Sequence, residues 1–207
     1  MSDQTIQPIT ENERWLLSFY RTSEISGALF FGRLAKSLKP GAIQHDMTKH
    51  FADESQHSWY WTECLQTLGF EPIKLDNAYQ DQYVAAGGMP VNIMEILAIT
   101  QVFEKRTIGQ YALHLNAPGT HPVIKQTLKK IMEDEKWHIQ WVDKALESLS
   151  AEYGADHIKK TLEHYRAADQ SVYENSVKEH RERIEGLFTY RLKNEEKSDE
   201  MSEEEKV

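Results

Sequence analysis

The sequence contains the same short pattern twice: an aspartate and a glutamate, followed by a histidine three residues after the glutamate. The copies, 81 positions apart, are Asp53-Glu54-Ser55-Gln56-His57 and Asp134-Glu135-Lys136-Trp137-His138. Residues i and i+3 of a helix lie on one face, so each glutamate and its histidine can reach the same metal ion. The repetition therefore predicts two helices that present matching metal ligands to a common interior.

Each copy follows a single glutamate, Glu24 or Glu104, by about thirty residues. A lone glutamate in a helical pattern normally faces solvent, because burying a carboxylate among apolar residues requires a partner. As part of the repeated set, the two glutamates would instead complete two oxygen-rich coordination spheres with one imidazole each. The predicted metal ligands are Glu24, Glu54, His57, Glu104, Glu135 and His138, with one or both of the motif glutamates bridging the ions.

Other metal sites fit the sequence less well. A zinc-protease site needs two histidines four residues apart, and the sequence has no such pair. A single cysteine, Cys64, excludes a disulfide framework and cysteine-ligated iron centres. The remaining histidines show no matching carboxylate spacing, so we interpret them as ordinary surface or core residues: His45, His50, His114, His121, His157, His164 and His180.

Proline, glycine and apolar periodicity divide the chain into helices. We expect four long helices, over about 10–38, from after Pro40-Gly41 to Gly69, from near Pro90 to before Pro118, and from Pro122 onward. Residues 70–89 have no sustained period and predict a connection with one short helical turn. An amphipathic helix over about 155–190 follows Gly154. The predicted fold class is all-α, a four-helix bundle with one long crossover and an additional C-terminal helix.

Composition indicates one globular domain and a tail. The 207 residues are 40% hydrophobic, enough for a single core. We expect a helical domain over 1–193, with its core bundle at about 10–149, and an acidic disordered tail over 194–207. The net charge of −9 argues against nucleic acid as a partner. No segment reads as a signal peptide or membrane span, which predicts a cytoplasmic protein.

The two halves of the chain read as an internal duplication. At offsets of 80 or 81 residues, further equivalent pairs follow the ligands: Phe31 with Tyr111, Asp53 with Asp134, and Tyr60 with Trp141. A pseudo-twofold axis between the helix pairs would place the two metals in nearly equivalent surroundings.

These residues resemble the ferritin-like di-iron carboxylate proteins, which include bacterioferritins, rubrerythrins and the ribonucleotide reductase small subunit. The resemblance covers residues 10 to about 149. It implies that Glu54 and Glu135 bridge the two metals. It also implies that Asp53 hydrogen-bonds His138 and Asp134 hydrogen-bonds His57, fixing each imidazole tautomer. Gln56 and Trp137 stand where the related monooxygenases have arginine, so the pattern departs from that branch.

Several neighbours of the ligands are candidates for further roles. Tyr111 lies two turns after Glu104 and is a candidate relay for an electron or hydrogen atom, although a core tyrosine is the simpler interpretation. Thr107, one turn after Glu104, is a candidate proton shuttle, with a helix back-bond as the alternative. Trp61, Trp137 and Trp141 would mainly shield the site from water, and Gly27 and Gly109 would leave room for a pocket or close helix packing.

The function expected from the ligand set is that of a non-haem di-iron enzyme that activates dioxygen and oxidises an apolar small-molecule substrate. The cofactor would be two Fe ions, with Mn or a mixed Fe and Mn pair fitting the same ligands, and an external electron donor would be required. The alternative is a ferroxidase, iron-handling or peroxide-detoxifying protein. A monomer or a homodimer with an elongated apolar pocket would favour the oxygenase, whereas a large hollow shell would favour storage.

Overall fold

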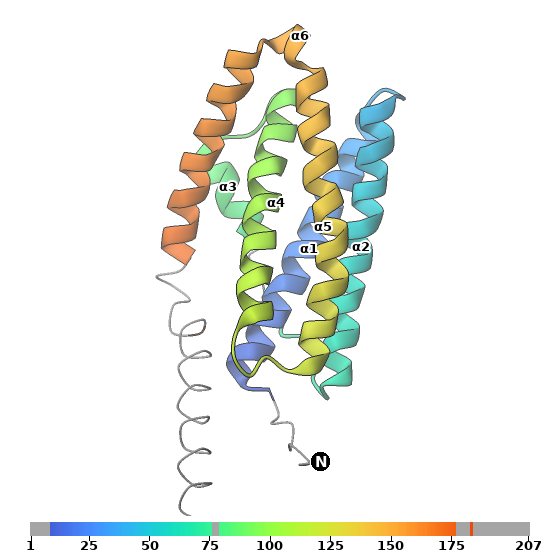
Figure 1. Ribbon diagram of the computed structural model, residues 1–207, viewed down its shortest axis with the longest axis vertical. Helices are drawn as coiled ribbons and strands as arrows, with labels where there is room; N and C mark the ends of the chain where they lie inside the picture. The colour runs from blue at the N-terminus through green and yellow to red at the C-terminus, as the bar shows by residue number, and fades with distance from the viewer. Residues whose placement is uncertain (1–8, 76–78, 177–182, 184–207) are drawn as a thin grey trace, which may run out of the picture.

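The computed structural model describes residues 9–75, 79–176 and 183, and these residues form an all-helical bundle (Figure 1). Four long helices make up the bundle: α1 (Glu11–Ser37), α2 (Ala42–Thr67), α4 (Ile93–Asn116) and α5 (Pro122–Ser148). Each lies within a few residues of the span predicted from the sequence. None of the helices within the described ranges is long and apolar enough to cross a membrane.

The direction of the helices is set by one long connection. Helices α1 and α2 run in opposite directions, α4 and α5 do likewise, and α2 and α4 point the same way (Figure 1). The connection over residues 68–92 therefore leads from one end of the bundle to the other. It contains α3 (Tyr79–Gly87), nine residues long, where the sequence predicted only a short helical turn. Burial of Tyr83 against Val172 and Phe103 supports α3, and such long-range packing leaves no periodic signal.

Local hydrogen bonds define several helix ends. The Thr10 side chain accepts the Glu13 N–H at 3.2 Å, and the Glu13 carboxylate accepts the Thr10 N–H at 3.0 Å, which completes the predicted capping box. At α4, the Asn92 side chain accepts the Glu95 N–H at 2.9 Å. Each such cap stabilises its helix by about 1 kcal/mol. Gly69 ends α2 with φ +81°, a conformation that a residue with a β-carbon rarely adopts.

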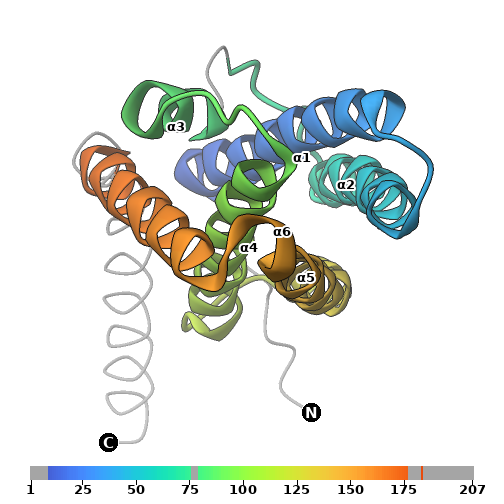
Figure 2. The same cartoon turned by 90° about the horizontal axis from the view of Figure 1, so that it is seen from above.

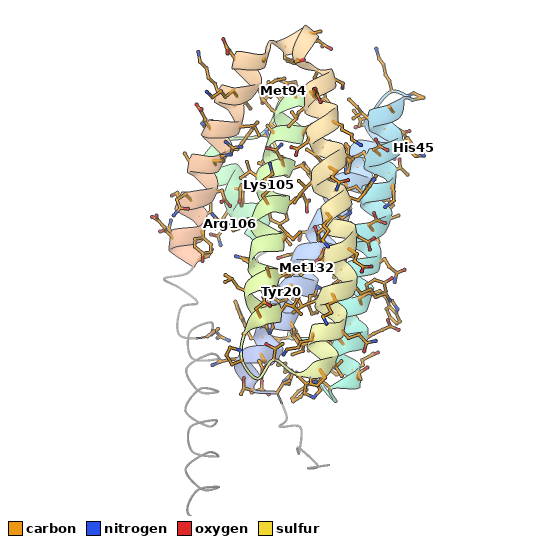
Figure 3. All side chains as sticks on the ribbon, in the orientation of Figure 1. Tyr20, His45, Met94, Lys105, Arg106 and Met132 are labelled. Atoms are coloured by element: carbon orange, nitrogen blue, oxygen red, sulfur yellow. The ribbon has the colours of Figure 1, made fainter. Side chains whose placement is uncertain are left out.

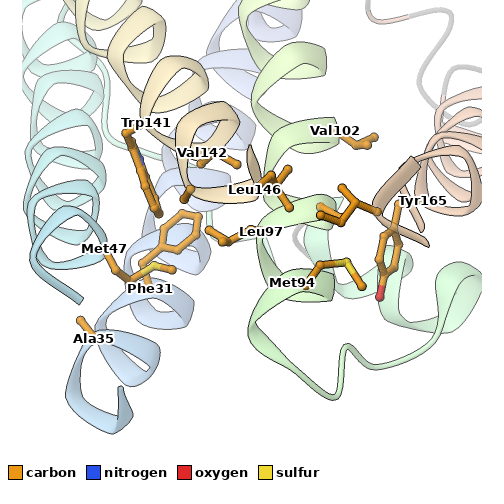
Figure 4. Packing of buried hydrophobic residues seen from close by; sticks show 13 residues of the cluster. Phe31, Ala35, Met47, Met94, Leu97, Val102, Trp141, Val142, Leu146 and Tyr165 are labelled. Carbon is orange, nitrogen blue, oxygen red and sulfur yellow. The ribbon is translucent and has the colours of Figure 1, made fainter. Parts of the chain in front are cut away.

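The apolar core is divided by the polar centre of the bundle. One cluster includes Leu17, Trp61 and Leu128, and the other, near the opposite ends of the same helices, includes Phe31 and Leu97 (Figure 4). Full burial of one such side chain contributes roughly 1.5–3 kcal/mol. The predicted metal ligands occupy the helix positions between these two clusters, so water has little access to them.

A further helix covers the outside of α4. After the short α6 (Ser150–Tyr153) and Gly154, residues 155–176 are helical, and this segment and α3 lie on the side of the bundle away from α2 (Figure 2). Arg106 of α4 forms an ion pair with Asp169, and Tyr165 packs into the core beside Met94 (Figure 4). The rest of the helix expected to reach about residue 190, and the expected tail over 194–207, lie outside the described residues.

Candidate metal centre

The six predicted ligands come together in the middle of the bundle, in two groups whose ligand atoms lie within 4.8 Å of one another. We call them the first cluster and the second cluster. The first cluster consists of His50, Glu54, Glu104 and His138, and the second of Glu24, Glu54, His57 and Glu135. Every member is at most 4% exposed. Glu54 belongs to both clusters, so the two groups form one continuous centre.

Glu135 also joins the two clusters. Its Oε1 lies 3.3 Å from Nδ1 of His57, and its Oε2 lies 3.3 Å from Nδ1 of His138. The two imidazole rings are 5.6 Å apart between centroids. A carboxylate placed between two imidazoles in this way has the position of a bridging ligand.

The two aspartates lie beside the histidines in a crossed arrangement. Oδ2 of Asp53 is 3.3 Å from Nε2 of His138, and Oδ2 of Asp134 is 3.3 Å from Nε2 of His57. This is the pairing that the resemblance implies. Because a carboxylate accepts the Nε2 proton of each ring, Nδ1 is left to face the interior as a potential ligand atom.

Burial and the charges of the centre shift the pKa values of several of its members. Desolvation, followed by repulsion from Glu24 and Glu104, raises the pKa of Glu54 well above its usual value. Burial lowers the pKa of His57 and His138, but the surrounding carboxylates outweigh burial and raise both pKa values well above the usual one. Burial also opposes ionisation of Glu104, yet the facing histidines hold its pKa below the usual value. Protons and a bound cation would therefore compete for the same side chains.

Four ligand atoms in the centre are buried and face one another in two ion pairs, His50 Nε2 with Glu104 Oε1 at 3.2 Å and His57 Nδ1 with Glu135 Oε1 at 3.3 Å, but none of them has a hydrogen bond of good geometry. An unsatisfied buried polar atom is costly, and buried carboxylates are normally paired or bound to metal. Four glutamates carry a charge of −4 when ionised, which two divalent cations would balance. The donor types, and the lack of well-formed hydrogen bonds at these four atoms, thus fit a pair of metal ions.

His50 is a member of the centre that sequence reasoning missed. The expectation that it has no carboxylate at a suitable spacing is wrong, because its Nε2 lies 3.4 Å from Oε1 of Glu54 and 3.2 Å from Oε1 of Glu104. Its ring is fully buried and stacks on His138 at 3.7 Å between centroids. The missed signal is the i, i+4 spacing of His50 and Glu54, which places them on one helix face as surely as i, i+3.

The tautomer of His50 follows from its contact with Trp141. The indole Nε1–H of Trp141 donates to Nδ1 of His50 at 3.2 Å. An indole nitrogen can only donate, so Nδ1 carries no proton and the neutral ring carries its proton on Nε2. Burial, and then the positive charge of His138, lowers the pKa of His50, which favours this neutral ring. In this arrangement His50 directs an N–H group, rather than a lone pair, at Glu54 and Glu104.

Tyr111 contacts the centre from the opposite half of the molecule. Its buried hydroxyl donates to Oε1 of Glu24 and accepts the indole N–H of Trp61 at 3.3 Å. The sequence places Tyr111 two turns after Glu104 on α4, but the hydrogen-bond acceptor of Tyr111 is Glu24 on α1. Phe31, the duplicate of Tyr111, instead stacks on His50 at 4.0 Å. The surroundings of the two clusters are therefore not equivalent, in contrast to the expectation from the duplication.

Other candidates lie at the edge of the centre or away from it. Thr107 is half-buried and belongs to neither cluster. Gly27 lies directly under Glu54, since a β-carbon added there would overlap Glu54 Oε2, whereas Gly109 is exposed and has open space around it. Trp137 lies under the Lys49 ammonium at 3.8 Å from the ring centroid. His45 lies on the exposed side of α2, as expected (Figure 3).

The described residues thus combine an all-helical bundle with two buried groups of carboxylates and imidazoles that are candidate metal sites. No protein-family model, curated protein or solved structure matches this chain.

Proposed function

We propose that this chain is a ferritin-like di-iron carboxylate oxidoreductase that uses dioxygen to oxidise an apolar organic substrate. The observation that carries the proposal is the buried centre, in which two groups of ligand atoms share Glu54 and four polar atoms lack a hydrogen bond of good geometry. The order and directions of the four long helices, with a connection along the bundle between α2 and α4, support the ferritin-like assignment.

The two ions would be held by Glu24, Glu54, His57, Glu104, Glu135 and His138. Glu54 and Glu135 would bridge them, because each lies between the two clusters. Mixed carboxylate and imidazole ligands, with no thiolate in the set, favour iron or manganese over softer metals. A reduced iron pair in such a centre supplies the electrons that activate dioxygen, and an external electron donor would restore them.

The protein's own side chains would orient these ligands and keep water out. Asp53 and Asp134 hold the Nε2 protons of the histidines, which leaves Nδ1 available for metal. Tyr111 fixes Glu24 by a hydrogen bond, and burial raises the pKa of its hydroxyl, so it remains a protonated donor at neutral pH. The two apolar clusters on either side of the centre restrict access of water.

A cavity beside the centre favours an organic substrate over iron storage as the function. The cavity has a volume of about 400 Å³, and its lining includes Gly27, Phe31 and Phe103. This volume falls within the range of small-molecule sites, which are mostly apolar. A ferroxidase, whose substrate is the metal ion itself, would have no need of such a space.

Anaerobic loading with ferrous iron tests the proposal. We expect two iron ions per chain, and on exposure to dioxygen an absorption band in the near ultraviolet with no further uptake of iron. Fewer than one ion per chain would contradict the metal centre. Continued oxidation of many added ferrous ions per chain would support the ferroxidase instead.

A further inference from the structure

The cavity beside the first cluster lies between α1 and α4 and is covered by Tyr83 of α3 and by Met89. Its wall changes from buried to exposed along its length. Gly27, Phe31 and Tyr83 are buried, whereas Leu29 is 58% exposed and Met89 67% exposed. The cavity therefore has an inner end within the bundle and a mouth at the surface.

The inner end borders the first cluster at three points. Gly27 lies against the carboxylate of Glu54, and Phe31 stacks on the ring of His50. Thr100 is buried one helical turn before Glu104, on the same side of α4. Because Gly27 has no side chain, the Glu54 carboxylate packs directly against the α1 backbone at a residue that also lines the cavity.

Arg33 is the one charged residue among those that line the cavity. It is exposed, and within the described part of the chain it makes no hydrogen bond or ion pair. Arg33 lies six positions after Gly27 on α1, which is a rise of about 9 Å along the helix axis at 1.5 Å per residue. A molecule whose anionic group contacted Arg33 would thus extend its other end toward the centre.

We propose that the cavity binds an elongated apolar molecule that carries one anionic group, such as a carboxylate, with the anion at Arg33 and the apolar end at Gly27. This inference rests on the proposed function and narrows its substrate class. A volume of about 400 Å³ falls within the range of sites that bind small organic molecules. A guanidinium pairs well with a carboxylate in two parallel hydrogen bonds, and the remaining wall offers mainly apolar contacts.

Calorimetry with three ten-carbon probes tests the binding mode. Decanoate, decan-1-ol and decyltrimethylammonium would each be titrated into manganese-loaded and metal-free protein. We expect decanoate to bind at least tenfold more tightly than the other two. Arg33→Glu should remove this preference, whereas Lys36→Glu, an equal change of charge at an exposed position on the same helix outside the cavity, should keep it. Equal binding of decanoate to the Arg33→Glu variant, or no saturable binding, would overturn the proposal.

A cavity-filling variant and a distance measurement locate the probe. Ser26→Phe should weaken decanoate binding at least tenfold, because the ring would occupy the space between α1 and α4. In the manganese-loaded protein, the terminal methyl protons of decanoate should relax faster than the protons next to the carboxylate. The reverse order would overturn the proposed orientation. Failure of manganese to bind would instead count against the metal centre, while decanoate binding to the metal-free protein would still report on the cavity.

Discussion

The two halves of the bundle, α1 with α2 and α4 with α5, keep the same ligand pattern but differ around it. Where α1 has Phe31, α4 has Tyr111, and where α2 has His50, α5 has Ile131. As a result, Glu104 faces a second buried imidazole, that of His50, whereas Glu24, among the described residues, faces only that of His57 and accepts a hydrogen bond from a phenol. The ligands alone therefore do not describe the chemistry of the two clusters.

The residues that pack beside the two clusters also differ between the halves. Tyr20 packs against Tyr111 and Trp61 at 4.9 and 5.2 Å between centroids and fills the space near the second cluster. Its duplicate is Thr100, a much smaller residue that lines the cavity beside the first cluster. The larger residue fills one side of the centre and the smaller one leaves space on the other, which would suit the substrate cavity proposed above.

Removal of the shared ligand should have the largest effect. Glu54→Ala takes a carboxylate from both clusters, so we expect the variant to lose most of both metal ions. Glu104→Ala takes a ligand from the first cluster alone and should retain about one ion per chain. Metal analysis after dialysis measures both numbers. Full occupancy of the Glu54→Ala variant would refute the assignment.

Metal affinity should rise steeply with pH. Since the pKa values of His57, His138 and Glu54 are raised in the fold, these groups hold protons that a metal ion must displace. Each proton released makes affinity increase about tenfold per pH unit. Calorimetric titrations in buffers of different ionisation enthalpy count the released protons, and a count of zero at pH 7 would contradict this account.

The same pKa shifts determine whether the metal-free protein gains or loses stability as pH rises. The raised pKa values of His57 and His138 stabilise the metal-free fold below pH 6.5, the usual pKa of histidine, and this contribution is lost as pH rises through the folded values. The lowered pKa values of His50, His114 and His121 act in the opposite direction, but His114 and His121 lie outside both clusters and affect metal-loaded and metal-free protein alike. We therefore expect the difference in Tm between metal-loaded and metal-free protein to widen from pH 6.5 to 8.5.

Gly27 and Gly109 form a matched pair for substitution by alanine. In Gly27→Ala the new methyl group must displace the Glu54 carboxylate, so metal affinity should fall by about 10–100-fold. In Gly109→Ala the methyl group meets open space, and helix stability should rise by about 0.5–1 kcal/mol with no change in affinity. Metal titration and thermal unfolding distinguish the two. Unchanged affinity in Gly27→Ala would show that Glu54 moves freely.

The role of His50 can be tested by giving α2 the residue that α5 has at the equivalent position, Ile131. His50→Ile copies the residue of α5 and should keep two ions per chain with about tenfold weaker binding, because a donor to Glu104 is lost but no ligand. His50→Gln restores an N–H donor and should recover most of the affinity. Loss of one ion in both variants would show that His50 is itself a ligand.

Trp141→Phe provides the complementary change. Without the indole N–H, Nδ1 of His50 is free to carry the proton, and Nε2 can then offer a lone pair to metal. We expect the visible spectrum of the cobalt-substituted variant to shift as the coordination changes. An unaltered spectrum would mean that the Trp141 contact does not control the tautomer.

The helices were predictable because their signals are local. Thr10 with Glu13, Gly69 and Pro122 mark helix ends within a few residues of sequence, and all three occur where expected. The repeated motif gave the positions of the candidate ligands because their spacing lies within single helices. The length of α3 was not predictable, since it depends on packing against residues distant in the chain.

The surroundings of the centre were harder to predict. The hydrogen bond from Tyr111 to Glu24 joins residues 87 positions apart and has no counterpart in local spacing. His50 lies four residues before Glu54, but the repeated motif has a spacing of three, and Ile131 occupies the equivalent place in the second half, so His50 is not part of the repeat. The sequence repeat thus identifies the ligands that the two halves share. It does not identify the residues around the ligands, which differ between the halves.

Glu54 and Glu135 serve both clusters, which makes the loading of the two ions interdependent. An ion at either place would fix both carboxylates and so prepare part of the coordination shell of the other, giving positive cooperativity. Native mass spectrometry during a stepwise titration should then show mainly empty and fully loaded chains, with few singly loaded ones. When metal is scarce, the protein would then be a mixture of fully loaded and empty chains rather than a population of singly loaded ones.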